Sequence, residues 1–307
     1  MASLDDKFEI AIGETRLLIL GVQVLVGLGY RSALEPGFAG LSRSSQYLKL
    51  GDLFLLLTCL AVIFSPVSYH RIVEAGQTRR DVLAYVNKMT EAGLLPLALG
   101  LGIELYVGAE GILTRGAAIA TGMIASLSAF ALWYGWEYVK RKERHRIGKQ
   151  ESRKEDRDDM KPTSINDKVK HVLLEERMVL PGVQALLGFQ LAVVLMDGFK
   201  HLPRSSQYIH LASLWLTTAS VILLIAPAAY HRIVEQGEAT ENFHRLAGKI
   251  MLASMAPLAL AMSGDLYVVA GKVTSPALAA ISSTLMLLLF AALWFAYPLY
   301  VRGHKTP

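Results

Sequence analysis

The sequence predicts an all-α, polytopic membrane protein with eight transmembrane helices, built as two parallel four-helix repeats. Of its 307 residues, 53% are hydrophobic and only 19% are charged. Residues 140–170 hold 19 of the 57 charged side chains, and the rest of the chain carries too little charge to solvate a globular surface. In addition, the segment 14–139 recurs without a gap as 175–300.

Eight stretches are long and apolar enough to cross a hydrocarbon core of about 30 Å, which takes about 20 helical residues. Several contain Gly or Pro, which membrane helices tolerate. We do not expect the first stretch to be a cleaved signal peptide, because acidic residues precede it and no small-residue cleavage site follows it. The expected spans are residues 16–34, 48–68, 89–109, 116–138, 177–196, 208–229, 248–270 and 277–300.

Lys and Arg are concentrated on one side of these spans. That side holds both termini, the loops after the second and sixth spans, and the whole 140–170 segment. Because loops rich in Lys and Arg stay in the cytoplasm, we expect both termini to be cytoplasmic.

The duplication is the clearest pattern in the chain. At an offset of 161 residues, 42 of 126 positions are identical. Each copy has an even number of spans, so both insert with the same orientation, related by an axis along the membrane normal. The expected units are therefore a first repeat at 1–139, a charged cytoplasmic connector at 140–172 and a second repeat at 173–307.

Such a chain is a pseudo-dimer within one polypeptide, and further oligomerisation stays open. The connector is interpreted as a solvated tether between the two copies. A contact with anionic lipids is the alternative for its basic residues Lys140, Arg141, Lys142, Arg144 and Arg146.

Several classes of protein are not favoured. The single Cys59 excludes a disulfide framework and a cysteine-based metal site. The basic residues alternate with acids and have no aromatic platform beside them, which argues against nucleic acid as a partner. No phosphate-binding loop or hydrolase motif is present. We predict no enzymatic activity, no metal site and no cofactor, and the lipid bilayer as the main partner.

The motif Glu-Glu-Arg-Met-Val-Leu-Pro-Gly-Val-Gln at 175–184, together with Ile-Ala-Pro-Ala-Ala-Tyr-His-Arg at 225–232, resembles a bacterial family of four-span membrane proteins of unknown function. The resemblance covers residues 175–270, and the first copy matches less closely. Members are often labelled automatically as sodium:proton antiporters. The resemblance implies a multi-pass protein of the bacterial inner membrane and ion transport as a hypothesis.

Glu104 and Asp265 are the leading candidates for chemistry. They occupy the same position in the two copies, near the outer end of the third span, and each is followed by Leu-Tyr-Val. Ionisable groups inside a membrane are costly and therefore candidates for function. These carboxylates are predicted to exchange a proton for a small cation. The alternative is that both lie at the membrane interface.

A Tyr-His-Arg motif ends the second span of each copy, after a proline. We interpret these residues as a proton relay or a cytoplasmic gate because His titrates near neutral pH. The alternatives are a structural role, with the arginines bound to Glu74 and Glu235 or to Glu14 and Glu175, or b-type haem ligation by the histidines. The motif residues are Tyr69, His70, Arg71, Tyr230, His231 and Arg232.

Gln23 and Gln184 lie at matching positions inside the first span of each copy, where we expect them to be buried. Buried amides in membranes usually hydrogen-bond across helices, so packing is favoured over substrate contact.

The sequence thus supports two hypotheses of different kinds. One is a transporter or channel for a small cation, with Na⁺/H⁺ exchange as the specific form. The other is a non-catalytic scaffold or an accessory subunit of a larger membrane complex.

Overall fold

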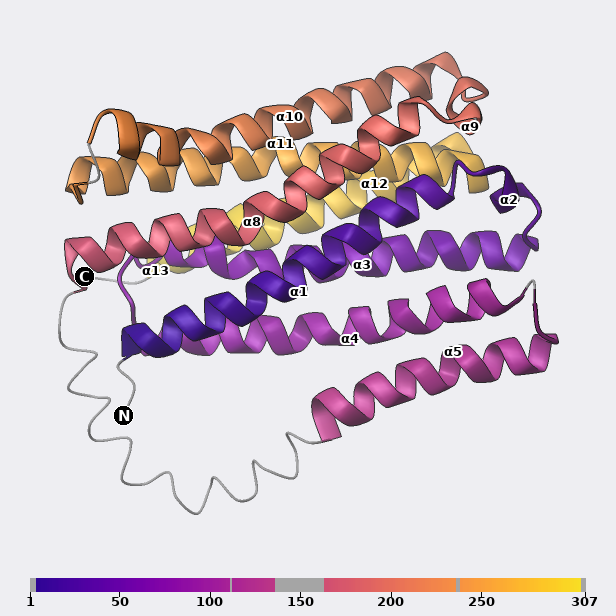
Figure 1. Ribbon diagram of the computed structural model, residues 1–307, viewed down its shortest axis with the longest axis horizontal. Coiled ribbons are helices and arrows are strands. Elements are labelled where there is room, and N and C mark those ends of the chain that lie inside the picture. The colour runs from indigo at the N-terminus through magenta and orange to yellow at the C-terminus, as the bar shows by residue number, and fades with distance from the viewer. Residues whose placement is uncertain (1–3, 111, 136–162, 236–237, 305–307) are drawn as a thin grey trace.

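The computed structural model describes residues 4–110, 112–135, 163–235 and 238–304, and this part of the chain is helical with no strand. Eight long helices run side by side along the molecule (Figure 1). The first copy contains α1 (Leu4–Ser32), α2 (Pro36–Ala39), α3 (Arg43–Ile72), α4 (Arg80–Glu110), α5 (Arg115–Phe130) and the π-helix η1 (Ala131–Gly135). The second contains α8 (Ile165–Val194), α9 (Asp197–Lys200), α10 (Arg204–Ile233), α11 (Glu241–Val273), α12 (Pro276–Ala291), the π-helix η2 (Ala292–Ala296) and α13 (Tyr297–His304).

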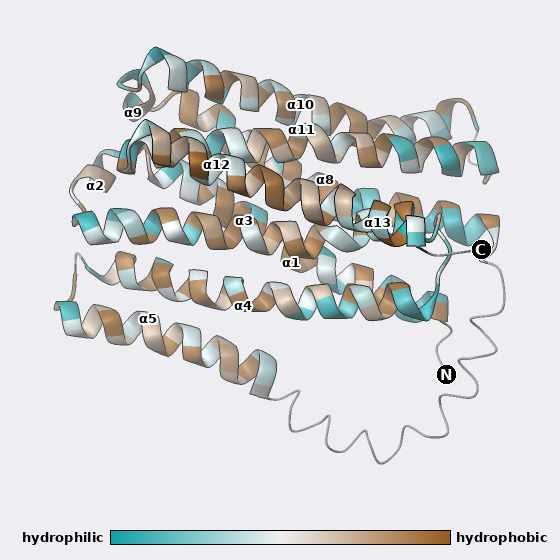
Figure 2. Cartoon of the chain, turned by 180° about the vertical axis from the view of Figure 1, so that it is seen from behind, coloured by the Kyte–Doolittle hydropathy of each residue, from teal (hydrophilic) through white to brown (hydrophobic). Residues whose placement is uncertain are grey.

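The eight expected spans are confirmed as helices long and apolar enough to cross a membrane. Figure 2 shows that hydrophobic residues dominate the middle of the bundle and that hydrophilic residues gather toward the helix ends. The two copies also match in detail. The short helices α2 and α9 begin at aligned positions, and so do η1 and η2, so the duplicated sequence determines even these irregular elements.

Local signals explain where the helices begin. Thr114 and Ser275 are aligned N-caps, and each accepts a hydrogen bond from a backbone N–H three residues later. Ser164 caps α8 in the same way. The prolines inside α3, α4, α8, α10 and α11 do not end these helices, as is common in membrane spans.

The helices continue beyond the apolar stretches. α8 begins at Ile165, so it includes the last residues of the predicted connector 140–172. The rest of the connector up to residue 162 lies outside the described residues, so the tether and its lipid contact stay predictions.

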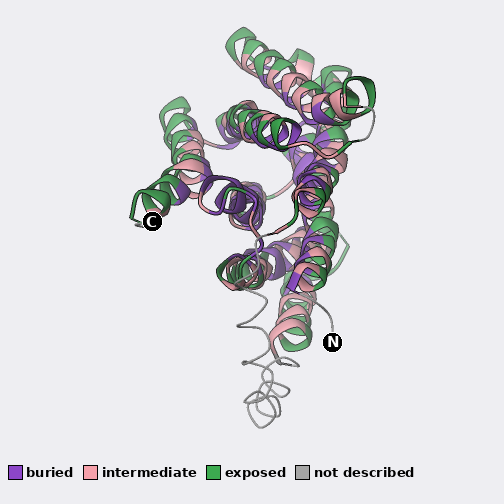
Figure 3. Ribbon diagram, turned by 90° about the vertical axis from the view of Figure 1, so that its left-hand side faces the viewer, coloured by how far each residue is buried: buried purple, intermediate pink, exposed green. Residues whose placement is uncertain are grey.

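The copies meet mainly where α1 packs along α8, and α3 also contacts α11, α12 and η2 of the second copy. Figure 3 shows that buried residues lie on the helix sides that face one another. The resulting arrangement is unequal. In the most apolar stretch of α3, 67% of the residues are buried, but in the corresponding stretch of the aligned helix α10 only 28% are. α3 is therefore central in the bundle and α10 is peripheral.

α1 begins and α13 ends at the same end of the bundle (Figure 1), as an even number of spans requires. α3 and α10 also end there, at Ile72 and Ile233, and we call it the terminal end. The other end, where α3 and α10 begin, is called the opposite end.

Candidate functional site

The first Tyr-His-Arg motif closes α3 at the terminal end. His70 and Arg71 lie in the last turn of α3, where cationic side chains interact favourably with the unpaired carbonyls, and both are buried. Tyr69 has a different environment, because its ring stacks on that of Tyr85 with 4.3 Å between centroids. Tyr69 also stacks on Tyr297 of the second copy, with 6.3 Å between centroids, so its contacts are aromatic, whereas His70 and Arg71 make polar contacts with the second copy.

Glu175 of α8 is the shared partner of these two residues. Its Oε1 lies 2.5 Å from Nδ1 of His70, and its Oε2 accepts a hydrogen bond of 2.5 Å from Nε of Arg71. The side chains of His70 and Glu175 are each 1% exposed. Glu175 is one of the four carboxylates that the sequence offered to Arg71 and Arg232, and it is the one that binds Arg71, while Glu74 pairs with Arg79 at 3.4 Å. A fully buried ion pair joins the two copies.

His244, in the first turn of α11, is a further partner of Arg71. Nη1 of Arg71 lies 3.0 Å from Nε2 of His244. A guanidinium group has only donors, so Nε2 of His244 accepts and the ring proton is on Nδ1. The loop after α3 covers this ring at Gly76, whose φ is +80° and where a Cβ atom would collide with His244. Glycine is required here by both the backbone conformation and the space.

His171 lies one turn before Glu175, on the same face of α8. It is fully buried, and its Nδ1 is 3.3 Å from Oγ1 of Thr78. The ring of Phe8 contacts both histidines, with centroids 4.8 Å from His70 and 5.1 Å from His171. We name this group the interface cluster: His70, Arg71, His171, Glu175 and His244.

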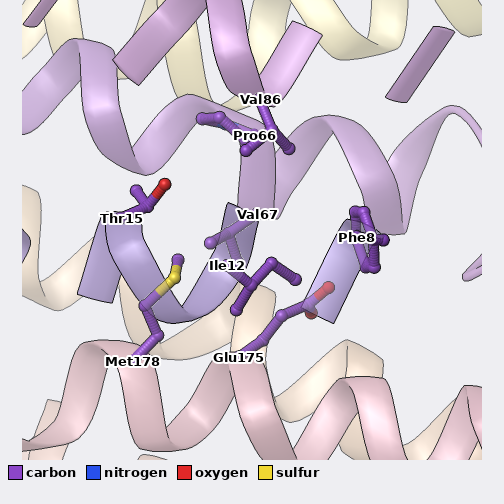
Figure 4. Close-up of a pocket in the computed structure, with 8 residues that line it drawn as sticks. All are labelled: Phe8, Ile12, Thr15, Pro66, Val67, Val86, Glu175 and Met178. Carbon is purple, nitrogen blue, oxygen red and sulfur yellow. The ribbon is translucent and has the colours of Figure 1, made fainter. Parts of the chain in front are cut away.

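Some buried polar atoms in and beside the cluster have no hydrogen-bond partner among the described residues. Nε2 of His70 is one within the cluster, and Oε1 of Glu176 is one beside it. A cavity of about 10 Å³ lies beside Glu175, between α1, α3, α4 and α8 (Figure 4). Thr15 and Met178 line it together with Phe8, Ile12, Pro66, Val67 and Val86. This volume is at the lower limit for one water molecule, and most of the lining is apolar. The cluster thus combines titratable groups with a small cavity beside its carboxylate.

At the opposite end, Asp265 of α11 is buried in a second polar group. Its Oδ2 accepts a hydrogen bond of 2.6 Å from Nε2 of Gln190, and its Oδ1 lies 2.8 Å from Nδ1 of His210. Nε2 of His210 is 3.1 Å from the backbone oxygen of Gln190. Each of the three side chains is at most 3% exposed.

Glu104, at the aligned position of the first copy, has a similar but more open environment. Nζ of Lys49 donates a hydrogen bond of 2.5 Å to its Oε1, and the Glu104 side chain is 31% exposed. Lys49 and His210 occupy the same position in the two copies, so each carboxylate is paired with a basic residue of its own copy. Glu104 and Asp265 are therefore held in two separate groups.

The second Tyr-His-Arg motif is not bound by a buried carboxylate as the first one is. The His231 ring lies 4.6 Å from that of Phe243, and Tyr230 stacks on the same ring at 6.3 Å. Arg232 is exposed, and so is Glu14, the residue of α1 that corresponds to Glu175. No ion pair between Arg232 and Glu14 forms in the described part of the chain, because α10 lies at the periphery.

Gln23 and Gln184 also differ. Gln23 is fully buried where α1 crosses α8, next to Gly182, but its amide has no hydrogen-bond partner among the described residues. Gln184 is exposed, so the prediction that both amides are buried is wrong for Gln184. The reason is that the α1–α8 contact is not exactly symmetric: nothing lies within 4 Å of a Cβ atom at Gly21, the position that corresponds to Gly182.

Sequence reasoning did not single out His171, His244, His210 or Gln190 as site residues. Two signals were available. His171 and Glu175 are four residues apart on a helix, which places them on one face. Lys49 and His210 align in the duplication, as their acidic partners do. No such signal marks His244 and Gln190, because Leu83 and Gly29 occupy the corresponding positions. In the described residues, no group of three or more His, Cys, Asp or Glu side chains is arranged to hold a metal ion.

The family comparison agrees with the duplicated architecture. One family model, described as "Family of unknown function (DUF6328)", matches the chain twice, at residues 2–137 and 159–298. No curated protein and no solved structure is detectably similar to the chain. The description of the family names no activity, so it supports the architecture and leaves the chemistry to the residues. The chain belongs to this family of unknown function and is a tandem duplication of its domain.

Proposed function

We propose that the protein is a membrane transporter that exchanges protons for a small cation such as Na⁺, and that the interface cluster carries the proton. Glu175 is the observation that carries this proposal. It is a carboxylate 1% exposed, bound to both a histidine and an arginine at the contact between two copies. A buried ionisable group that binds specific charged partners is a candidate for function.

The chemistry of the pair suits a proton relay. A proton can pass between Oε1 of Glu175 and Nδ1 of His70, which are 2.5 Å apart, without movement of either helix. This transfer converts a carboxylic acid and a neutral imidazole into a carboxylate and an imidazolium. Arg71 stays charged throughout and favours the carboxylate.

Protonation is also linked to the arrangement of the two copies. Uptake of one proton changes the charge at the contact of α3 with α8 by one unit, and α3 and α8 belong to different copies. A change in this contact favours a different position of one copy relative to the other. Alternating access in transporters built from repeats depends on such movements.

We assign the cation to Glu104 and Asp265 at the opposite end. Carboxylate oxygens suit a hard cation, and each of these carboxylates is now neutralised by Lys49 or His210. If His210 releases its proton, Asp265 loses its positive partner and its affinity for a cation rises.

Proteoliposomes that contain a pH-sensitive dye test this function. An imposed Na⁺ gradient is expected to change the internal pH with the wild-type protein. Glu175→Gln is expected to reduce the rate to that of empty vesicles, since the amide cannot take up a proton. Glu14→Gln is the matched control, because it makes the same change at the aligned and exposed position, and it should keep the wild-type rate.

The double variant Glu104→Gln/Asp265→Asn tests the cation site in the same assay. If this variant keeps the wild-type rate, the cation assignment is wrong. If Glu175→Gln keeps the wild-type rate, the proton assignment is wrong.

A non-transporting scaffold or accessory subunit is the second candidate function. The environment of Asp265 favours it, since Gln190 and His210 bind both carboxylate oxygens as a structural network would. Purification of the full chain in mild detergent separates the two functions. A stable co-purifying partner, together with wild-type vesicles that show no Na⁺-dependent pH change, would favour the scaffold.

We further propose that the membrane is the bacterial inner membrane and that the terminal end is cytoplasmic. The excess of Lys and Arg on the side of the termini supports this orientation.

A further inference from the structure

The second Tyr-His-Arg motif borders an open hollow at the terminal end. The hollow has a volume of about 320 Å³ and lies between the first half of α8, the end of α10 and the segment before α11. Its polar lining consists of Asn166, Lys170, Arg177 and His231, and its remaining lining is aliphatic, including Val169 and Ala239.

Substitutions between the copies explain why the hollow is open. In the first copy, the ring of Phe8 and the side chain of Thr78 contact the buried His171. The corresponding residues in the second copy are Val169 and Ala239, which are smaller. The place that the first copy fills with side chains is therefore left empty in the second.

The charge at the hollow also differs from that at the corresponding place in the first copy. Asp5 and Glu9 of the first copy are replaced by Asn166 and Lys170. Lys170 is partly neutralised, since its Nζ lies 2.5 Å from Oε1 of Glu9 across the contact between the copies. Compared with the corresponding place in the first copy, the hollow thus has two acidic residues fewer and one basic residue more.

Two of the groups at the hollow have donors that no described residue uses. Arg177 is exposed and has no hydrogen bond or ion pair among the described residues. Nε2 of His231 is buried and has no hydrogen-bond partner in the same part of the chain. A guanidinium group and an imidazole N–H are both strong donors to phosphate oxygens.

The depth of the hollow favours a lipid as the source of the phosphate. Arg177 stands where the apolar part of α8 begins, which is the level of the lipid headgroups if this stretch spans the membrane as proposed. The aliphatic residues of the hollow suit a glycerol backbone and the first acyl carbons. The geometry points to a binding site for the phosphodiester of an anionic phospholipid, with Arg177 and His231 as its ligands. This site is independent of the proposed transport.

Lipid retention by the full chain tests this inference. The protein is purified in detergent, mixed with equal amounts of phosphatidylglycerol and phosphatidylcholine, and analysed by native mass spectrometry. The wild type is expected to retain phosphatidylglycerol selectively. Arg177→Gln is expected to reduce this retention roughly tenfold, because one charge-assisted contact is lost. Arg16→Gln makes the same change at the aligned, exposed position of α1 and should have no effect.

A second variant changes the shape of the hollow without changing its charge. Val169→Phe restores the side chain of the first copy, fills the hollow and is expected to lower phosphatidylglycerol retention as Arg177→Gln does. Equal retention of both lipids by the wild type would overturn the inference, and so would unchanged selectivity in Arg177→Gln. Competition by inorganic phosphate or glycerol 3-phosphate at millimolar concentration would also overturn it, since the ligand would then be a soluble phosphate.

Discussion

The two copies end their second span with the same three residues, Tyr-His-Arg, but these residues have different environments. In the first copy, Glu175 of the other copy binds His70 and Arg71 in a buried cluster. In the second, Arg232 is exposed and His231 borders an open hollow. The chemistry of the motif is therefore determined by what the other copy brings to it.

The fourth span of each copy gives a second contrast. Trp294 in η2 is fully buried and donates a hydrogen bond of 2.9 Å to the backbone oxygen of Ala61 in α3. Trp133 in η1 is only half-buried, and Ile222, which corresponds to Ala61, is 63% exposed. One fourth span thus covers the second span of the other copy, and the other does not. Duplication has allowed one copy to form the centre of the bundle and the other its periphery.

The largest expected difference between the copies is at Glu175. Glu175→Ala removes the carboxylate and leaves Arg71 buried without its counterion, so we expect the free energy of unfolding to fall by about 3–5 kcal/mol. Glu14→Ala, at the aligned position, is expected to cause no measurable change because Glu14 is exposed. Denaturant titration of both variants in the same detergent measures the difference.

Equal effects of these two substitutions would show that the copies are more alike in solution than the asymmetric arrangement implies. The double variant Glu175→Ala/Arg71→Leu is a useful addition, since it removes both charges. It should recover part of the lost stability, because the unpaired buried charge is the main source of the loss.

A smaller difference is expected at the two tryptophans. Trp294→Ala removes a buried ring and its hydrogen bond to Ala61, and we expect a loss of about 2–3 kcal/mol. This is below the range for water-soluble cores, because in a membrane the lost contribution is mainly packing. Trp133→Ala should cost clearly less. The same titrations provide the measurement, and an equal loss in the two variants would contradict the central position of α3.

The sequence was sufficient to predict the eight spans and the duplication, because both depend on patterns that extend over many residues. It was also sufficient to name Glu175 among the four carboxylates offered to Arg71 and Arg232. Which carboxylate binds Arg71 depended on how the end of α3 meets α8, which no local pattern encodes. The exposure of Gln184 was missed for the same reason, because a perfectly repeated sequence position does not require a perfectly repeated environment.

The opposite end shows where alignment of the copies is informative. Glu104 and Asp265 align, and so do their partners Lys49 and His210. The pairing is therefore a property of the repeat, because both members of each pair align between the copies. Gln190 adds a third member in the second copy only, since Gly29 occupies its position in the first. The result is a more buried carboxylate in the second copy, which distinguishes the two proposed cation sites.

The smallest expected difference concerns the crossing of α1 and α8. A Cβ atom at Gly182 would collide with the buried amide of Gln23, whereas nothing lies within 4 Å of a Cβ atom at the aligned Gly21. Gly182→Ala is therefore expected to separate the two helices and to lower the free energy of unfolding by about 1–2 kcal/mol, as overpacking does. Gly21→Ala should be neutral or slightly stabilising, because alanine favours the helix. Gln23→Ala provides the control, since it removes the colliding amide. In that background Gly182→Ala should cost much less, and a cost that stays the same would mean that α1 and α8 do not cross at this glycine.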